Sequence, residues 1–318
     1  MGKETCPKKS YGGQALIEGV MMKGGHHMAM AVRRVDGTIS IEVEECDSIV
    51  EKYPFLKWPF VRGTVNLVDS LVTGFKALTY SANESAESEE EELSDKEIIL
   101  SVALALVLGI GLFFLLPVGL AHLTKAYVTS SAMQNIVEGI IRVAIFMIYI
   151  VAISNMKEIA RTFQYHGAEH KSIHCLEAGL DLTVENAQKF TTLHPRCGKS
   201  FLFIVMIISI FVFSLVGVEN LAWRLASRIV LLPVVAGVSY EFLKFTARHM
   251  DSAVGRALSW PGMMMQKMTT KEPEDDMVEV AIASLKAVMR AEGELPPEEE
   301  EVAEPEEEVT EPQEEVAE

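Results

Sequence analysis

One short stretch of the chain, Tyr165 to Cys175, holds residues that bind metal ions and move protons, in the order H-x-x-E-H. On a helix, His166 and His170 fall one turn apart on the same face, so both imidazoles can reach a single ion. Glu169 lies close enough to handle a proton. The same order occurs in inverted zinc peptidases, where the carboxylate is the general base toward metal-bound water.

Further residues of metal-ligand type follow. His174 extends the same face by another turn, and His194 and Cys197 form an H-x-x-C pair. Mixed imidazole and thiol donors favour zinc. A closed set of four ligands would be structural, whereas three ligands and a water would be catalytic. Without a metal, the histidines would hydrogen-bond neighbouring helices or contact lipid headgroups, and Cys197 would be a small buried hydrophobe.

Glu241 is a further candidate ligand, because a carboxylate at the edge of an apolar segment needs a partner. A bound cation, Lys244 or Arg228 could supply one, and depth along the segment favours the cation or Lys244. Headgroup water is the alternative. The predicted zinc ligands are therefore His166, His170, His194, Cys197 and Glu241, with Glu169 as the catalytic base.

Four apolar segments precede or follow these residues and predict membrane-spanning helices, which need about 20 residues each. They are Ile98 to Ala121, Ile136 to Met156, Phe201 to Val218 and Ile229 to Phe245. In the second segment, Glu138 and Arg142 are one helical turn apart and can neutralise each other. Pro233 is expected to kink the fourth.

The basic residues predict the orientation of these spans. Only Lys125 lies between the first two spans, whereas six Lys and Arg residues lie between the second and third. Because such residues accumulate on the cytoplasmic side, we expect the central loop and both termini to be cytoplasmic. Arg224 and Arg228 on the outer side run against this bias. The predicted location is the bacterial cell membrane, with multiple passes and the lipid bilayer as a partner.

The region before the first span has β and α signals. Met28 to Arg34 and Thr38 to Glu44 alternate around an Asp-Gly turn and predict a hairpin. Asn66 to Tyr80 has apolar residues at helical spacing, which predicts an amphipathic helix on the bilayer or the bundle. The glycines around Gly12 to Met22 fit either strands of a small sheet or the close approach of a substrate.

The net charge of -17 is concentrated in two acidic segments, and the rest of the chain is mildly basic. Acidic runs without aromatic residues cannot bury enough apolar surface, so both segments are expected to be disordered. No basic stripe with interleaved aromatic residues is present, which argues against nucleic-acid binding. The four cysteines have no disulfide-framework spacing and are expected to be free thiols or metal ligands.

These patterns predict a mainly α fold, a four-span helical membrane bundle with a small cytoplasmic α+β element and a cytoplasmic His/Cys loop. The expected organisation is an α+β segment with an amphipathic helix (1–83), an acidic linker (84–97), the first two spans (98–156), the His/Cys loop (157–200), the last two spans (201–245), a cytoplasmic C-terminal segment (246–291) and a disordered acidic tail (292–318).

Several motifs resemble those of a bacterial family. They are Gly12-Gly13-Gln14-Ala15 leading into Ile17 to Met22, Trp58-Pro59 with Arg62-Gly63, Phe163 to Lys171, His194 to Cys197 with Ser200-Phe201-Leu202, Arg228 to Glu241, and Pro261-Gly262 with Thr269-Thr270. Through them the chain is similar to the YqhQ-like proteins, the domain of unknown function 1385 family. The resemblance implies a multi-pass, metal-dependent membrane enzyme without naming its reaction. It nominates His166, Glu169, His170, His194 and Cys197 for the metal site.

Three functional hypotheses follow. The first is a zinc-dependent membrane enzyme, of hydrolytic type, with its site at the cytoplasmic membrane face and a substrate that the sequence does not identify. The second is a zinc-stabilised scaffold or assembly factor that binds a protein partner without catalysis. The third is a small transporter, indicated by Glu138, Arg142 and Glu241 within or beside the spans.

Overall fold

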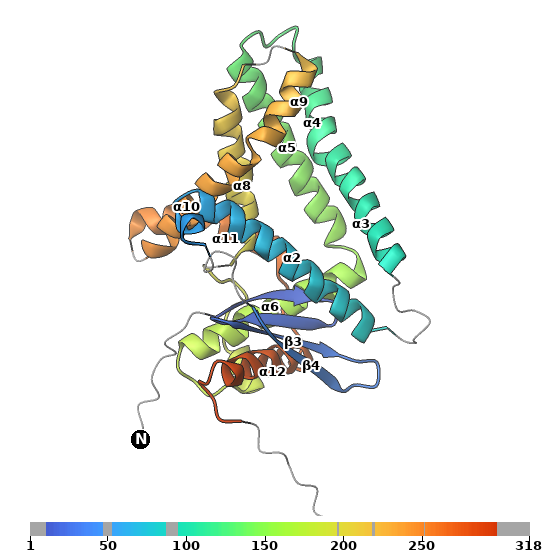
Figure 1. The fold of residues 1–318 in the computed structure, drawn as a ribbon, viewed down its shortest axis with the longest axis vertical. Coiled ribbons are helices and arrows are strands. Elements are labelled where there is room, and N and C mark those ends of the chain that lie inside the picture. Colours follow the sequence, from blue (N-terminus) through green and yellow to red (C-terminus); the bar gives the residue numbers. More distant parts are fainter. Residues whose placement is uncertain are drawn as a thin grey trace, which may run out of the picture.

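The computed structural model describes residues 11–46, 53–86, 95–195, 197–217, 220–250 and 252–297. Its fold is mainly helical, with one small antiparallel sheet near the N-terminus (Figure 1). The sheet and the helices packed on it form one end of the molecule, and a bundle of apolar helices extends away from them.

The sheet is a meander of four strands in the order β1-β2-β3-β4. The strands are β1 (Gly12–Leu16), β2 (Gly19–Lys23), β3 (His27–Arg33) and β4 (Ile39–Glu45). The predicted hairpin is confirmed as β3 and β4, and the glycine-flanked segment forms the β1–β2 hairpin. At Gly19 an added Cβ would lie 2.4 Å from the carbonyl oxygen of Ala31, so only glycine fits that strand crossing.

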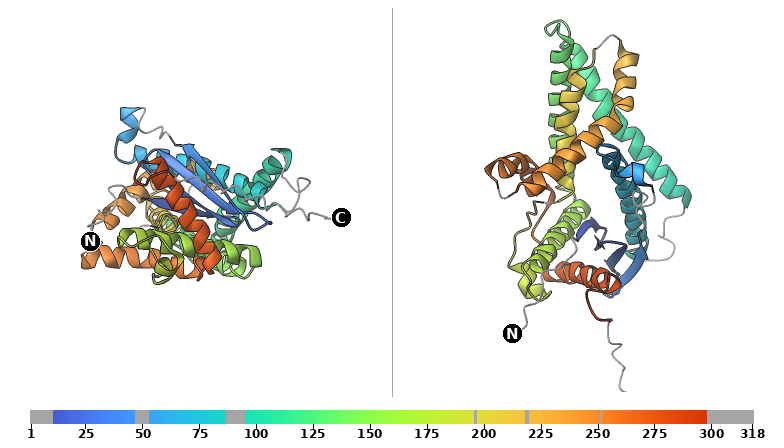
Figure 2. Two further views of the ribbon diagram at one scale, coloured as in Figure 1. Left: turned by 90° about the horizontal axis from the view of Figure 1, so that it is seen from below. Right: turned by 60° about the vertical axis from the view of Figure 1, so that its left-hand side comes forward.

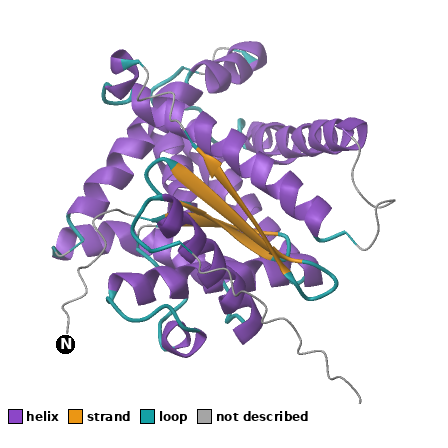
Figure 3. Ribbon diagram, turned by 60° about the horizontal axis from the view of Figure 1, so that its bottom comes forward, coloured by secondary structure: helices purple, strands orange, loops and turns teal. Residues whose placement is uncertain are grey.

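Helices cover both faces of the sheet (Figures 2 and 3). On this side of the molecule lie η1 (Pro54–Lys57), α2 (Val61–Glu84), α6 (Lys157–Glu177), α7 (Val184–Gln188) and α12 (Asp275–Ala291). The main core lies between the sheet, α6 and α12, and α2 packs Ala77 against a second cluster on the opposite face. The predicted amphipathic helix is confirmed within α2.

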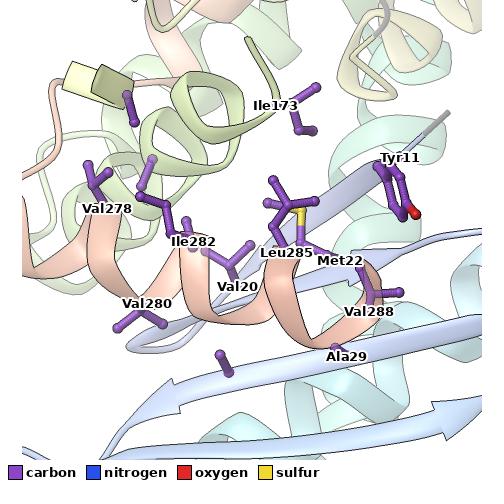
Figure 4. Close-up of a cluster of buried hydrophobic side chains, with 14 of the residues drawn as sticks. Tyr11, Val20, Met22, Ala29, Ile173, Val278, Val280, Ile282, Leu285 and Val288 are labelled. Atoms are coloured by element: carbon purple, nitrogen blue, oxygen red, sulfur yellow. The ribbon is translucent and has the colours of Figure 1, made fainter. Parts of the chain in front are cut away.

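The helix α12 shows why the C-terminal segment joins the sheet. Val278, Ile282, Leu285 and Val288 recur at helical spacing and are all buried. Figure 4 shows Leu285 beside Met22 of β2, and Val278 lies at the other end of the helix. The helix therefore buries a continuous apolar stripe against residues more than two hundred positions earlier in the chain.

The bundle contains the apolar segments. Its helices are α3 (Asp95–Ile110), a π-helical turn η3 (Gly111–Leu115), α4 (Leu116–Leu123), α5 (Ser131–Ile153), α8 (Lys199–Ser214), α9 (Leu221–Val230), α10 (Leu232–Arg248) and α11 (Ala253–Thr269). The C-terminal ends of α4 and α8 and the N-terminal ends of α5 and α9 lie at the end far from the sheet (Figure 1).

The expectation of four spans is met only in part. Two helices, Lys96–Leu123 with 28 residues and Ser131–Ile153 with 23, are long and apolar enough to cross a membrane. The pair α9 and α10 is bent by 44° and would make a third if it counts as one broken span. The helix α8 has 16 residues; at a rise of about 1.5 Å per residue it falls short of a hydrocarbon core of about 30 Å.

The bend expected at Pro233 lies two residues earlier. Leu231 separates the two helices, and Pro233 takes a position in the first turn of α10, where its missing N–H is not needed.

The acidic segments lie largely outside the described residues, which omit 87–94 and everything after 297. Within the described part, Glu84 ends α2. The buried carboxylate of Glu292 accepts hydrogen bonds from the backbone N–H groups of His26 (2.6 Å) and His27 (2.8 Å). The first residue of the predicted tail thus caps the turn between β2 and β3. Cys46 and Cys175 are free thiols, in line with the expectation of free thiols or metal ligands.

Candidate metal centre

The helix α6 carries the metal-binding motif into the interior of the sheet-side layer. It contacts β1 and α12 along its length. His166 and His170 are each 1% exposed and Glu169 is 5% exposed. Burial of three ionisable groups on two adjacent turns requires partners for their polar atoms.

A first group of possible ligands consists of His166, His170 and Cys197, all buried. One ligand atom from each lies within 4.8 Å of the others. The Nε2 atom of His166 lies 3.4 Å from the Cys197 sulfur. The predicted pairing of the helix with the H-x-x-C loop is therefore present in the structure.

Both imidazoles of this group are oriented by backbone carbonyls. His166 Nδ1 lies 2.8 Å from the carbonyl oxygen of Thr269, and His170 Nδ1 lies 2.5 Å from that of Thr192. A carbonyl oxygen only accepts, so each Nδ1 carries the proton and donates it. The lone pair then resides on Nε2, the usual arrangement of a metal-bound histidine and its hydrogen-bond partner.

The chain crosses close above this face of α6. At Gly167 an added Cβ would lie 2.1 Å from the carbonyl oxygen of Lys271. The Lys271 N–H also donates to the Phe163 carbonyl. Gly167 thus lets the end of α11 approach the helix and bring Thr269 to His166.

A second group consists of His174, Glu177 and His194, again with one ligand atom each within 4.8 Å. His174 Nε2 donates to the Leu193 carbonyl at 2.9 Å, so the lone pair of the His174 ring resides on Nδ1. His194 Nε2 lies 3.4 Å from a Glu177 carboxylate oxygen. Burial, followed by the neighbouring charge of His174, lowers the pKa of His194 to about 4. His194 is therefore a neutral imidazole at pH 7.

The two groups adjoin each other. The ring centroids of His166 and His170 are 4.3 Å apart, those of His170 and His194 5.6 Å, and those of His194 and His174 4.6 Å. Gln266 holds the His194 backbone by accepting from its N–H at 2.9 Å and donating to its carbonyl at 2.8 Å. The predicted ligand set thus divides, with His194 beside Glu177 rather than in the first group.

Glu169 is in neither group. An added Cβ on Gly13 in β1 would lie 3.1 Å from Glu169 Cγ, so this side chain lies against the sheet. Its role as a catalytic base stays a prediction.

Glu241 is in neither of the two groups found among the described residues, and its role as a ligand stays a prediction. Its two carboxylate oxygens accept from Nε and Nη2 of Arg62 at 2.7 and 2.6 Å. Arg62 comes from α2, which crosses α10 closely where Gly63 meets Gly237. In the structure the cationic partner of this carboxylate is Arg62, which contacts both of its oxygens. The depth of Glu241 along the apolar segment favours a bound cation or Lys244 instead.

Several residues that shape the site were not predicted. Glu177 follows His174 at the spacing H-x-x-E and could have been found from that pattern. The carbonyl groups of Thr192 and Thr269 leave no trace in the residue types, because a backbone acceptor is common to every residue.

The donor set of the first group fits a transition metal. Two imidazole nitrogens and one sulfur are ligands that zinc accepts, and three protein ligands leave a fourth tetrahedral position. The described residues thus define the class: a mainly helical protein with apolar helices of spanning length and buried His/Cys groups beside a small sheet.

Comparison with known proteins places the chain in a family. A family model described as "Protein of unknown function (DUF1385)" matches residues 58–291, a range that contains every candidate ligand. The chain is 38% identical over 310 residues to the "Uncharacterized protein YqhQ" of Bacillus subtilis (strain 168), covering 92% of this chain and 96% of the relative. The chain belongs to this DUF1385 family. No solved structure matches it.

Proposed function

We propose that this chain is a multi-pass membrane protein that binds zinc through His166, His170 and Cys197 and uses the metal for hydrolysis. In this proposal the helices cross the cell membrane as four passes, with both termini in the cytoplasm. The last two passes are α8, whose short length requires local thinning of the bilayer, and the bent α9–α10 pair. The zinc centre then lies on the cytoplasmic side, in the layer that holds the sheet. The observation that carries the proposal is the first group itself, with both Nδ1 atoms tied to carbonyls.

In this proposal zinc would supply a Lewis acid and lower the pKa of a bound water to about 7. The chain's own contribution is to hold two neutral imidazoles and one thiolate in fixed orientations. Glu169, buried on the same helix, is the candidate proton acceptor. Peptide, lipid and small-molecule substrates all suit such a centre.

The first test is the zinc content of the full-length protein purified in detergent. We expect about one zinc per chain from the three-ligand group, and its loss in His170→Ala and Cys197→Ala. The matched controls are His122→Ala, an exposed histidine, and Cys46→Ala, a half-buried cysteine outside both groups. Zinc that survives both ligand substitutions would refute the assignment. A second equivalent that disappears only in His174→Ala would show that the second group also binds a metal.

A structural role for zinc is the second candidate. The ligands and their carbonyl partners come from α6, the segment 192–197 and the end of α11, so one ion would tie three segments together. A structural metal contributes folding free energy, which predicts loss of the folded layer in His170→Ala.

Glu169→Gln separates these two candidates. If the centre is hydrolytic, this variant keeps its zinc and its thermal unfolding midpoint but loses turnover of any substrate found by screening peptide, ester and phosphoester libraries. The physical reason is that the amide cannot accept the proton from metal-bound water. Turnover equal to that of the unmodified protein would rule out Glu169 as the base.

A further inference from the structure

A second cluster of buried polar residues lies in the bundle, on α5 and α9. We call it the Arg–Glu cluster: Glu138 and Arg142 on α5, and Arg224 and Arg228 on α9. Their exposed fractions are 1%, 9%, 3% and 2%, respectively.

Glu138 is the carboxylate that all three arginines share. Its Oε1 accepts from Arg142 Nη2 at 2.7 Å, and its Oε2 accepts from Arg224 Nε at 2.7 Å. Arg228 reaches both oxygens, at 3.3 and 3.2 Å. The pairing of Glu138 with Arg142 expected from the sequence is present, and two further cations join it.

The charges in this cluster do not balance. Three guanidinium groups are always protonated, and one carboxylate offsets only one of them. Within the described part of the chain, no other carboxylate forms an ion pair with these arginines. The cluster therefore holds a formal excess of two positive charges in a buried setting.

The remaining contacts of the arginines are to neutral groups. Arg142 Nε donates to the Phe113 carbonyl at 2.9 Å, and Arg228 Nη2 donates to Asn135 Oδ1 at 2.6 Å. The Phe213 ring lies 4.3 Å from the Arg228 guanidinium carbon. Dipoles and ring faces soften the electrostatic penalty, but none of them carries a negative charge.

Arg224 shows the imbalance at a single carboxylate oxygen. Its Nε and Nη2 lie 2.7 and 2.6 Å from the same atom, Glu138 Oε2. Arg228 Nη2 lies 3.2 Å from that oxygen as well. Three guanidinium nitrogens thus share one carboxylate oxygen, and a second anion would relieve this crowding.

We propose that the Arg–Glu cluster is a binding site for a phosphate group, held by Arg224 and Arg228 with Arg142 nearby. A planar guanidinium matches phosphate oxygens with paired hydrogen bonds. A phosphate monoester or inorganic phosphate carries between about 1.5 and 2 negative charges at pH 7, which matches the excess. A phospholipid headgroup offers the same oxygens with one charge.

The position of the cluster suits either source. Arg224 is in the first turn of α9, and Glu138 is seven residues into α5, about 10 Å at helical rise. Both helices begin at the end of the bundle far from the sheet (Figure 1). The excess of buried positive charge does not depend on a membrane, whereas a phospholipid as the source of the phosphate group also requires the proposed membrane location.

The test uses the full-length protein in maltoside micelles, which contain no phosphate. We expect inorganic phosphate to raise the thermal unfolding midpoint relative to chloride at equal ionic strength, or phospholipid to remain bound in native mass spectra. Arg224→Gln should weaken the apparent phosphate affinity by about tenfold or more, because a charge-assisted hydrogen bond is lost. Lys125→Gln removes an exposed cation from the connection between α4 and α5 and should change nothing.

A second variant keeps the test decisive if Arg224→Gln does not fold. Ser227 Oγ lies 3.5 Å from Arg228 Nη1, so Ser227→Asp places a carboxylate within the cluster. This variant should be stable without phosphate and should no longer respond to it. Glu185→Gln, which removes an exposed acid on α7, should leave the phosphate response unchanged.

The two probes distinguish the two possible sources of the phosphate group. A response to inorganic phosphate identifies a soluble anion, and retained phospholipid with no response to inorganic phosphate identifies a headgroup. The proposal is overturned if the unmodified protein shows neither, or if Arg224→Gln and Ser227→Asp respond as it does. Because none of these variants touches a zinc ligand, their zinc content reports on the proposed function independently.

Discussion

The candidate metal centre and the Arg–Glu cluster are both buried and polar, but they offer opposite chemistry. In the candidate metal centre, carbonyl groups accept hydrogen bonds from the Nδ1–H groups, so the Nε2 lone pairs and a sulfur converge. In the Arg–Glu cluster, the N–H groups of three arginines converge on one carboxylate. The atoms that converge in each cluster therefore decide its ligand: nitrogen lone pairs and sulfur favour a cation, and excess guanidinium N–H groups favour an anion.

The largest effect is expected from Glu138→Gln, which removes the only described carboxylate of the Arg–Glu cluster. Breaking a buried ion pair by removing one partner costs about 3–5 kcal/mol. We expect the folded fraction in detergent, measured by size-exclusion chromatography and thermal unfolding, to fall sharply. Glu185→Gln, whose side chain is exposed beside Lys189, is the control and should leave the midpoint unchanged.

Phosphate sharpens this experiment. If the cluster binds an anion, phosphate should restore part of the stability of Glu138→Gln, because it replaces the missing negative charge. If Glu138→Gln is as stable in chloride as the unmodified protein, the burial of the three arginines does not depend on Glu138.

The sequence predicts local spacing well and lateral position poorly, and the two clusters show why. The spacing of His166 and His170 determines that they share a helical face. Arg224 and Arg228 looked like exceptions to the charge bias outside the membrane, because composition does not reveal that α9 turns them toward Glu138. Depth along a span likewise placed Glu241 near the metal, although its partner Arg62 lies 179 residues away.

The fold follows the same rule. The β3–β4 hairpin, α2 and the first two apolar helices follow from local periodicity. The packing of α12 on the sheet does not follow from local periodicity, because the apolar stripe of this helix could pack on any apolar surface. The pairing depends on long-range burial of residues such as Leu285.

An intermediate effect is expected from Gly167→Ala, which tests the carbonyl side of the comparison. The new Cβ would meet the Lys271 carbonyl oxygen and displace the end of α11, and with it the Thr269 acceptor of His166. Loss of such an orienting hydrogen bond weakens metal affinity by about 10- to 100-fold. Competition with a calibrated zinc chelator measures the change.

Gly198→Ala is the matched control for that substitution. Gly198 adjoins the ligand Cys197, and an added Cβ there would meet nothing within 4 Å. Zinc affinity should therefore match that of the unmodified protein. Equal affinities in both alanine variants would show that the Thr269 carbonyl does not tune the site.

The smallest effect is expected from Glu241→Gln. The ion pair of Glu241 with Arg62 has side chains that are 24% and 25% exposed, and such pairs contribute about 0.2–1 kcal/mol. The thermal unfolding midpoint should drop slightly, and Arg62→Gln should cause a similar drop. The double variant should lose less than the sum of the two, because the residues share one interaction. Zinc content should stay at its original value throughout. Zinc loss in Glu241→Gln but not in Arg62→Gln would show that Glu241 is a zinc ligand, and that the candidate metal centre extends to α10.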